Sequence, residues 1–192
     1  MISDTKVVAI GGGTGLSTML KGLKLHTHNI TAVVTVADDG GSSGILRSDL
    51  GMLAPGDVRN CVSALAEVDP VMGELLNFRF KDGSLKGHSL GNLFLAALNE
   101  TSSSFDEAVK KFSHLTGVVG TVYPVTNESV TLSALLEDGR LIEGESHIGV
   151  HHDGPKNGIV KLMVNPEKPK AVDGVIKALE KADIIVLGPG SL

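Results

Sequence analysis

Several residue types are scarce in this sequence of 192 residues, and each scarcity excludes a class of protein. Cys61 is the one cysteine, so no internal disulfide can form. No apolar run approaches the about 18 residues that a membrane-spanning helix needs, and residues 1–10 lack the pattern of a signal peptide. Aromatic residues make up 3% of the chain, with no tryptophan, which disfavours base-stacking platforms for single-stranded nucleic acid. We therefore expect a cytoplasmic protein without membrane insertion.

Positively charged residues are fewer than negatively charged ones, with 17 lysines and arginines against 22 aspartates and glutamates. The formal net charge is −5 and there is no long basic run, so we expect no nucleic-acid partner. Hydrophobic residues at 42% and charged residues at 20% are typical of a globular domain with a sizeable core. Glycine is abundant instead, with 24 residues that cluster in loops. This clustering indicates several places where the backbone approaches another group closely.

Short apolar runs alternate with helical periodicities along most of the chain. Runs at 6–10 and 30–37 flank a helical pattern at 16–23, and this strand–helix–strand order is typical of a doubly wound fold. Further helices are predicted at 57–68, 89–100, 104–115 and 171–182, followed by a last strand. We therefore predict an α/β fold, Rossmann-like and doubly wound, with a mostly parallel sheet.

Residues 118–165 have a sequence pattern that differs from the rest of the chain. They contain several strand-like runs, and Asp138-Gly139 has the composition of a hairpin turn between two of them. We predict a strand-rich insertion at about 118–165 within a single domain that spans 1–192. Because the chain stops just after a buried strand, where such a fold places a ligand loop, we expect it to be truncated at the C-terminus.

Residue types at the predicted helix starts indicate how those helices are capped. Asp57 is predicted to be an N-cap, and so is Ser89. Ser104 and Glu107 have the spacing of a capping box. Cys61 falls on the apolar face of its helix, so we predict that it is a core residue.

Two adjacent acids, Asp38 and Asp39, end the second predicted strand and run directly into "GGSSG" at 40–44. Carboxylates at this position often bind a ribose hydroxyl in doubly wound folds, or they could hold a divalent metal. A solvated turn is the alternative. The glycine and serine backbone N–H groups would attract an anion, so the stretch could serve both ends of a nucleotide.

The stretch "GGGTG" at 11–15 follows the first strand and opens a helix, where backbone N–H groups favour a phosphate. It does not match the dinucleotide fingerprint, because the sixth residue is Leu16, and no Lys-Ser/Thr pair completes a P-loop. A tight strand-to-helix turn is the alternative. Two other glycine loops also follow strands, and they strengthen the anion hypothesis.

Polar residues in two further loops are candidates for the same site. Arg59 is a phosphate candidate, since a cation beside a helix N-terminus needs an anion nearby, and Arg47 is a weaker one. His88 and Asn92 either line the same crevice or satisfy buried backbone groups. His147 and His151 are four residues apart, but carboxylates and cysteines at ligand spacing are missing, so a surface loop is favoured over zinc.

Taken in order, "AIGGGTG", "TVADDGGSSG", "PGDVRNC", "GHSLGN" and "IVLGPGSL" strongly resemble the YvcK family, also called the gluconeogenesis factor family. That family is related to the CofD phospholactate transferases. The resemblance runs from residue 6 to the end of the chain. It implies a Rossmann-like fold, a cytoplasmic bacterial protein, binding of UDP-N-acetylglucosamine, and a role in cell shape and in growth on gluconeogenic carbon sources. No catalysed reaction is established for this branch.

The CofD branch implies a different function, transfer of a phospholactyl group onto a deazaflavin with a guanylyl donor and Mg²⁺. Asp38 and Asp39 would then hold the metal; otherwise we assign no metal or cofactor. A dinucleotide-binding oxidoreductase is disfavoured by the missing fingerprint. We expect UDP-N-acetylglucosamine or a related nucleotide as ligand, and a homo-oligomeric assembly. The predicted ligand-binding residues are Gly11, Gly12, Gly13, Thr14, Gly15, Asp38, Asp39, Gly41, Ser42, Ser43, Asp57, Arg59, Asn60, His88, Ser89, Asn92, Gly188, Gly190 and Ser191.

Overall fold

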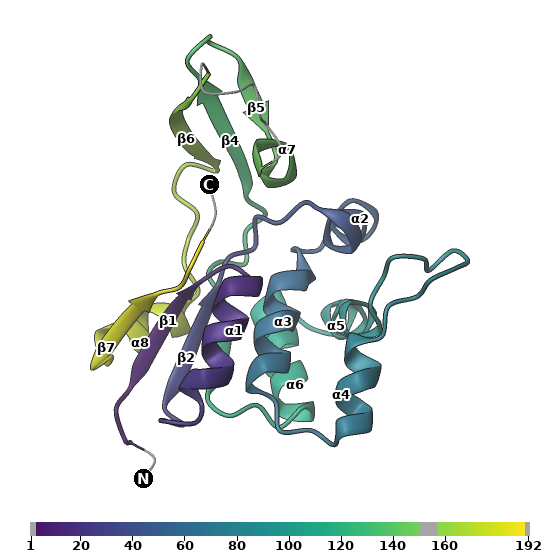
Figure 1. The fold of residues 1–192 in the computed structure, drawn as a ribbon, viewed down its shortest axis with the longest axis vertical. Helices are drawn as coiled ribbons and strands as arrows, with labels where there is room; N and C mark the ends of the chain where they lie inside the picture. The colour runs from purple at the N-terminus through teal and green to yellow at the C-terminus, as the bar shows by residue number, and fades with distance from the viewer. Residues whose placement is uncertain (1–2, 150–156, 191–192) are drawn as a thin grey trace.

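A four-stranded parallel sheet forms the centre of the computed structural model, which describes residues 3–149 and 157–190 (Figure 1). Its order is β3-β2-β1-β7, and every neighbouring pair is parallel. The predicted α/β fold with a mostly parallel sheet is therefore confirmed. The strands are β1 (Val7–Gly11), β2 (Ile30–Val34), β3 (Thr121–Pro124) and β7 (Ile184–Leu187).

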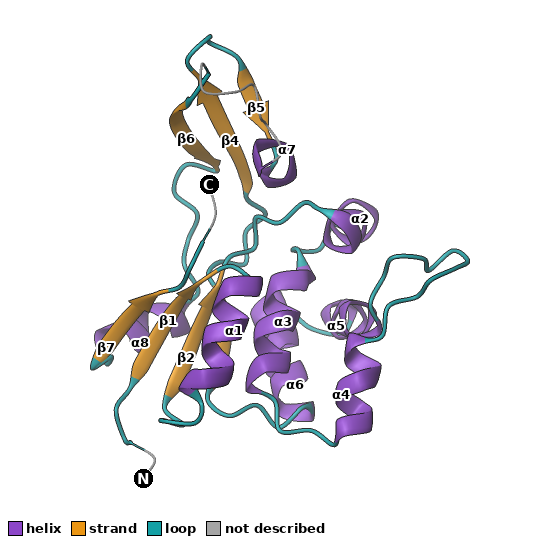
Figure 2. Cartoon of the chain, in the orientation of Figure 1, coloured by secondary structure: helices purple, strands orange, loops and turns teal. Residues whose placement is uncertain are grey.

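Helices cover both faces of this sheet, but unequally (Figure 2). A large apolar core joins one face to α1, α3, α5 and α6, with Leu16, Val58, Leu95 and Phe112 fully buried in it. A smaller cluster on the other face joins Val8 and Val33 to α8. The helices named here are α1 (Thr14–Leu23), α3 (Pro55–Leu65), α5 (Leu90–Glu100), α6 (Phe105–Leu115) and α8 (Asp173–Glu180).

A second, antiparallel sheet stands beyond the carboxyl ends of the parallel strands (Figure 1). It has the order β5-β4-β6 and packs against the short helix α7. Its elements are β4 (Thr131–Leu136), β5 (Leu141–Glu143), α7 (Glu145–Gly149) and β6 (Ile159–Asn165). The predicted hairpin turn is present, with Gly139 at φ +85° between β4 and β5.

The insertion is shorter than the predicted span of 118–165. Its first strand-like run became β3, which pairs in parallel with β2 in the main sheet, so the separate sheet begins only at β4. Strand-like composition alone does not reveal which sheet a strand joins. That choice is made by long-range pairing.

Three helices among the described residues were not predicted, and α7 is one of them. The glycine- and serine-rich stretch after Asp39 forms α2 (Gly41–Leu50), which ends at Gly51 in the left-handed conformation. Helix α4 (Pro70–Asn77) starts with Asp69 as N-cap and Pro70 at its first position. Glycine-rich composition lowers helix propensity by about 1 kcal/mol per glycine, so the contacts of α2 with its neighbours must stabilise it. No helix in the described parts of the chain is long and apolar enough to cross a membrane.

The predicted caps were right at two helices and wrong at one. Ser89 caps α5, and Ser104 caps α6, while Glu107 accepts a bond from the N–H of Ser103, the residue before the cap. The N-cap of α3 is Ala54, which has no side-chain acceptor. Asp57 lies three residues further on because Pro55 starts the helix. Its carboxylate is therefore available to another part of the molecule.

Candidate functional site

A cavity of about 770 Å³ lies at the carboxyl ends of all four parallel strands. Each strand runs into a loop that lines it, which is where open α/β sheets bind their ligands. These lining residues are Gly12, Gly13, Thr14 and Gly15 after β1, Thr35, Val36 and Ala37 after β2, Val125 and Thr126 after β3, and Pro189 and Gly190 after β7.

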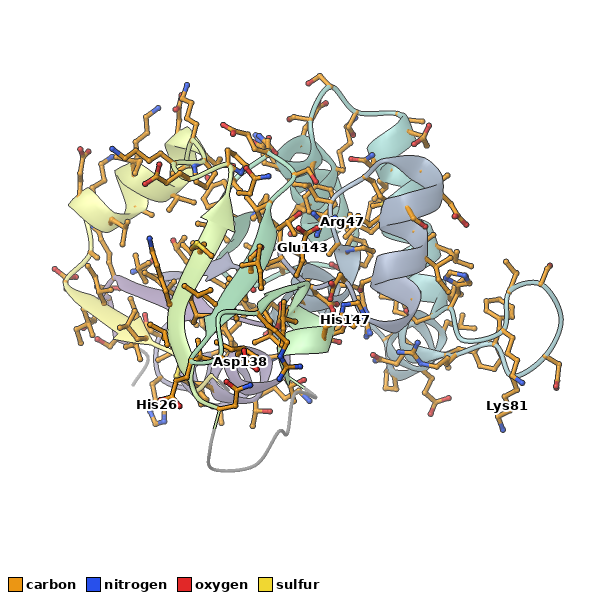
Figure 3. The ribbon with its side chains drawn as sticks, turned by 90° about the horizontal axis from the view of Figure 1, so that it is seen from above. His26, Arg47, Lys81, Asp138, Glu143 and His147 are labelled. Atoms are coloured by element: carbon orange, nitrogen blue, oxygen red, sulfur yellow. The ribbon has the colours of Figure 1, made fainter. Side chains whose placement is uncertain are left out.

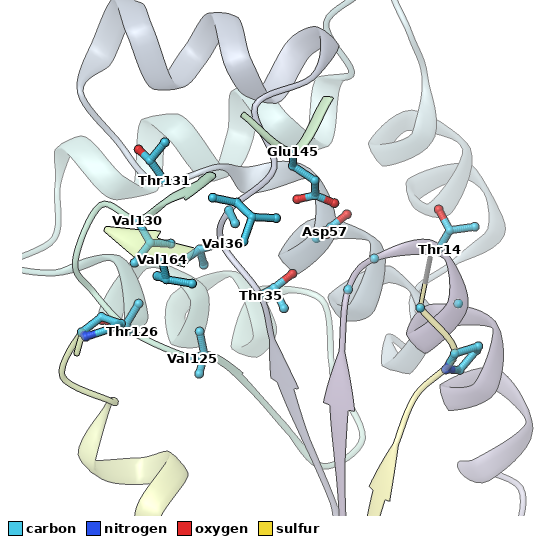
Figure 4. Close-up of a pocket in the computed structure, with 18 residues that line it drawn as sticks. Thr14, Thr35, Val36, Asp57, Val125, Thr126, Val130, Thr131, Glu145 and Val164 are labelled. Atoms are coloured by element: carbon cyan, nitrogen blue, oxygen red, sulfur yellow. The ribbon is translucent and has the colours of Figure 1, made fainter. Parts of the chain in front are cut away.

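The small antiparallel sheet provides the opposite wall (Figure 4). Apolar side chains dominate this wall, and Glu145 at the start of α7 is its acidic member. The cavity therefore lies between the two sheets, with backbone donors on one side and apolar surface on the other. The remaining lining residues are Val130, Thr131, Leu132, Glu145, Val164 and Pro169, together with Asp57 from α3.

Asp57 holds the glycine loop after β1 in place through its carboxylate. Its carboxylate accepts hydrogen bonds from the backbone N–H of Gly13 and from the side chain of Thr35. A Cβ at Gly13 would lie 2.0 Å from Asp57 Oδ1, so only glycine fits there. Burial raises the pKa of Asp57 and the charge of Asp38 raises it further, while the bonds from Gly13 and Thr35 and the charge of Arg59 oppose this rise. One donor of the predicted anion loop is thus already occupied by a carboxylate.

The last glycine loop lies directly on the first. A Cβ at Gly15 would lie 2.5 Å from the carbonyl oxygen of Pro189, and the Gly188 N–H donates to the Ile10 carbonyl at 2.7 Å. Gly190 lines the cavity, whereas Ser191 lies outside the described residues. The two loops together form the floor of the cavity beside the N-terminus of α1.

Glu145 faces Asp57 across the cavity, and Figure 4 shows their carboxyl groups directed toward each other. Burial raises the pKa of Glu145, and the charges of Asp57, Asp38 and Asp39 raise it further. An ionised carboxyl group accepts hydrogen bonds from hydroxyl or amide groups, and a protonated one can also donate a bond. The cavity can therefore recognise a ligand rich in hydrogen-bond donors.

Asp38 and Asp39 do not line this cavity. Asp38 accepts the Gly40 N–H at 2.9 Å within its own turn. Asp39 accepts the Ser146 N–H at 2.8 Å and so holds the start of α7. Each acid has its own backbone partner, and the described residues contain no group of three or more metal-ligating side chains.

Four other residues of the predicted site, Ser42, Arg59, His88 and Asn92, form a buried network beneath α2. The Ser42 hydroxyl lies 2.9 Å from His88 Nδ1 and accepts from the Asn92 amide at 3.1 Å. Asn92 Oδ1 in turn accepts from Arg59 Nε at 3.3 Å, and Arg59 Nη1 donates to Asn77 at 2.8 Å. The hydrogen bonds of these groups are satisfied by one another across α2, α3, α4 and α5. They support the alternative in which these residues have a structural role.

Arg47 connects α2 to the small sheet. It donates to the Ser129 hydroxyl at 3.1 Å and to the Val130 carbonyl. With Asp39, Glu143 and His147 it lines a smaller hollow of about 270 Å³, and Figure 3 shows Arg47, Glu143 and His147 near one another at the edge of the small sheet. His147 lies on α7, while His151, its predicted partner, is outside the described residues.

The structure thus divides the predicted ligand residues. Those that line the large cavity are Gly12, Gly13, Thr14, Gly15, Asp57 and Gly190. Those that do not line it are Gly11, Asp38, Asp39, Gly41, Ser42, Ser43, Arg59, Asn60, His88, Ser89, Asn92 and Gly188.

Sequence reasoning missed the entire wall made by the small sheet. Glu145 lies far from the glycine motifs along the chain, within a stretch that shows only strand and turn signals. The polar residues Thr35 and Thr126 follow β2 and β3, and their position after strands of a parallel sheet could have identified them.

Known proteins resemble this chain in sequence and in structure. The family model of CofD, described as 2-phospho-L-lactate transferase CofD, matches residues 7–192. A curated relative from Clostridium acetobutylicum is 54% identical over 192 residues, which cover 100% of this chain and 43% of that protein. A Bacillus subtilis relative named Gluconeogenesis factor is 46% identical over 190 residues, covering 97% of this chain and 58% of that protein.

The crystal structure of a Bacillus halodurans protein has the same fold. It superposes with a TM-score of 0.92 at 44% identity, and the match covers 98% of this chain and 60% of that one. The chain therefore spans about half the length of the curated relatives it matches.

Proposed function

Because the chain belongs to the CofD family, we propose that its large cavity binds a nucleotide sugar, UDP-N-acetylglucosamine. The observation that supports this most is that the cavity has backbone N–H donors and carboxyl groups beside each other. Backbone N–H groups at the start of α1, which has no side-chain cap among the described residues, lie at one end, and the carboxyl groups of Asp57 and Glu145 lie beside them. A nucleotide sugar carries both matching features, a diphosphate and hydroxyl or amide donors.

The size and the walls of the cavity agree with this proposal. A volume of about 770 Å³ falls within the roughly 300–1,000 Å³ of typical small-molecule sites. The valine, leucine and proline side chains of the small sheet and its connection would pack against the flat or hydrocarbon parts of the ligand. A monophosphate would leave much of this surface uncovered.

The role that we propose is regulatory. The Bacillus subtilis relative is named Gluconeogenesis factor, and we extend that role in gluconeogenic growth to this chain, together with a role in cell shape. A binding protein of this type needs no catalytic group at the ligand, and it would act in the cytoplasm through a protein partner.

A CofD-type transferase is the second candidate, favoured by the description of the matching family. Its guanylyl donor would use the same floor of glycine loops. Mg²⁺ would neutralise the phosphate charge, but the separate backbone partners of Asp38 and Asp39 do not prepare a joint metal site. We therefore rank this candidate below the regulator.

A melting series separates the two candidates. UDP-N-acetylglucosamine, UMP, GDP and NAD would be added at equal concentration, with and without EDTA, to this chain and to the longer Bacillus subtilis relative. At ~100 times the dissociation constant, linkage gives about 2.7 kcal/mol. For a chain of this size, that corresponds to a rise in melting temperature of roughly 5–11 °C.

We expect the largest rise with UDP-N-acetylglucosamine, and we expect EDTA to leave it unchanged. Equal shifts for all four ligands on the longer protein would contradict the nucleotide-sugar proposal. A shift that appears only with GDP, and only when Mg²⁺ is present, would support the transferase instead.

A further inference from the structure

Among the described residues, strand β6 is an edge of the small sheet. The order β5-β4-β6 gives it one neighbour among the described residues. It is seven residues long, and its side chains are largely exposed, with exposed fractions of 63% for Val160, 39% for Leu162 and 41% for Val164. Edge strands of this length usually carry charges or proline that prevent pairing, whereas Lys161 is the one charged side chain in β6.

The hydrogen-bonding direction of β6 follows from its neighbour β4. The Leu132 carbonyl accepts from the Gly144 N–H, and the Leu136 N–H donates to the Arg140 carbonyl, so even-numbered residues of β4 direct their backbone groups toward the β5 side. In an antiparallel pair, the residues opposite them direct theirs away from the shared ladder. Leu162 and Val164 are those residues, and they present N–H and C=O groups to the free edge.

We propose that β6 pairs with β6 of a second copy of this chain, in antiparallel orientation, to form a six-stranded sheet across a two-fold axis. The regular part of the strand is 161–165, because the ladder with β4 is irregular at Val160. Centring the axis on Met163 places each Leu162 opposite Val164 of the other copy. The outward backbone groups of these two residues then form the hydrogen bonds of the new ladder.

The sequence of β6 is self-complementary in this register. Leu162 and Val164 form two apolar cross-strand pairs on one face, and such pairs each contribute roughly 0.2–1 kcal/mol. Lys161 lies opposite Asn165, so no like charges meet on the other face. The two Met163 side chains meet on the axis, where their flexibility helps them to pack. A two-fold contact requires this kind of self-matching surface.

The other edge of the same sheet is a poorer partner. Strand β5 has three residues, it ends in Glu143, and α7 follows it directly. Among the described residues, β7 is one of the two edges of the main sheet, and it competes with β6 because Ile184, Ile185 and Leu187 are exposed. It is shorter, with four residues, and so offers fewer ladder bonds.

Cysteine cross-linking tests both the contact and its register. In the proposed pairing Met163 occupies a non-hydrogen-bonded site, where Cα atoms lie about 4.5 Å apart, within the about 4.4–6.8 Å range of disulfides. Met163→Cys should therefore give a disulfide-linked dimer under mild oxidation. Lys161→Cys is the matched control on the same face, because its two copies would lie about 13 Å apart, four residues along the strand. The native Cys61 is buried, and burial raises the pKa of its thiol to about 12, so it should not cross-link.

Sedimentation velocity over a wide range of concentrations completes the test. We expect wild-type protein to dimerise, Leu162→Lys to weaken the dimer at least tenfold, and Ile185→Lys on β7 to leave it unchanged, with circular dichroism confirming that both variants fold. Cross-linking of Lys161→Cys as fast as Met163→Cys would overturn the register. A dimer lost with Ile185→Lys but kept with Leu162→Lys, or a wild-type chain that stays monomeric, would overturn the contact itself. All of these readouts are taken without a ligand, because Val164 also lines the cavity.

Discussion

The polar residues beneath α2 and those around the large cavity differ in how their hydrogen bonds are satisfied. Beneath α2, Ser42, His88, Asn92 and Arg59 bond to one another and are buried. In the cavity, Asp57 and Glu145 face each other with like charge, and their pKa values are raised. The first arrangement stabilises the native state, whereas the second lowers its stability at neutral pH.

This contrast shows how to separate structural from functional polar residues in this chain. The residues beneath α2 and Asp57 sit near glycine motifs in the sequence, whereas Glu145 does not, and both groups contain residue types that bind nucleotides. A group whose partners are all internal has little left to offer a ligand. Carboxyl groups held close together in a cavity are typical of a site whose repulsion a ligand relieves.

The largest expected effect comes from breaking the buried network. Asn92→Ala removes the acceptor of Arg59 Nε and a donor to Ser42, so two buried groups lose a partner. Because bonds to a charged group are involved, we expect a loss of about 3 kcal/mol of unfolding free energy, or roughly 6–12 °C in melting temperature. Asn99→Ala on the same helix is the control. Equal small losses in calorimetry for both variants would show that the network contributes little.

A smaller loss is expected where the glycine loop meets Asp57. Gly13→Ala would place a Cβ 2.0 Å from Asp57 Oδ1 and force the carboxyl group aside. We expect a destabilisation of about 2 kcal/mol and a loss of ligand binding. Gly22→Ala lies on α1 with no atom within 4 Å of the new Cβ, so it should stabilise the protein by about 0.5–1 kcal/mol. Thermal melts of the two variants that shift in the same direction would contradict this account.

Gly12→Val tests the cavity floor rather than the fold. A Cβ at Gly12 makes an ordinary contact of 3.4 Å with Asp57 Oδ2, so Gly12→Ala should be tolerated. The two further methyl groups of valine would extend from this crowded position and block the approach of a phosphate. We expect about 1 kcal/mol of destabilisation and no ligand binding by calorimetry. Wild-type affinity in Gly12→Val would place the phosphate elsewhere, with the loop at 188–190 as the next candidate.

Asp39→Asn probes the link between the two regions. Asparagine keeps an oxygen for the Ser146 N–H but loses the charge of that bond. We expect less than about 1 kcal/mol of destabilisation together with weaker ligand binding, because α7 carries Glu145 into the cavity. Asp49→Asn, which changes an exposed acid on α2 that does not line the cavity, is the control. Full affinity in a folded Asp39→Asn protein would restrict Asp39 to a role in the turn.

The smallest expected effect is the pH dependence of the carboxyl pair. An acid whose folded pKa is raised binds more protons in the native state, so stability falls as pH rises from its ordinary value toward its raised one. For Glu145 that decline begins near pH 4.5, and Asp57 adds to it from near 3.8. Glu145→Gln should flatten the decline of melting temperature above this range. Identical pH profiles for wild type and Glu145→Gln would show that the pKa of Glu145 is not raised in the folded protein.

The chain by itself determined the fold class and part of the cavity floor. The apolar runs around Val8 and Val33, each followed by a polar or glycine-rich loop, specify parallel strands whose loops meet at one edge, because parallel strands in a sheet end together. Local rules also specified the caps at Ser89 and Ser104 and the turn at Gly139, since each depends on residues only a few positions apart.

Only the tertiary structure decided which polar residues face the cavity. Arg59 and Asp57 are two positions apart on α3, yet one bonds to Asn92 and Asn77 while the other reaches the loop at Gly13. Glu145 reaches the site because the small sheet stands over the carboxyl ends of the parallel strands. Local spacing carries no information about these encounters. Side-chain roles here depend on partners from distant segments, and packing of the two sheets selects those partners.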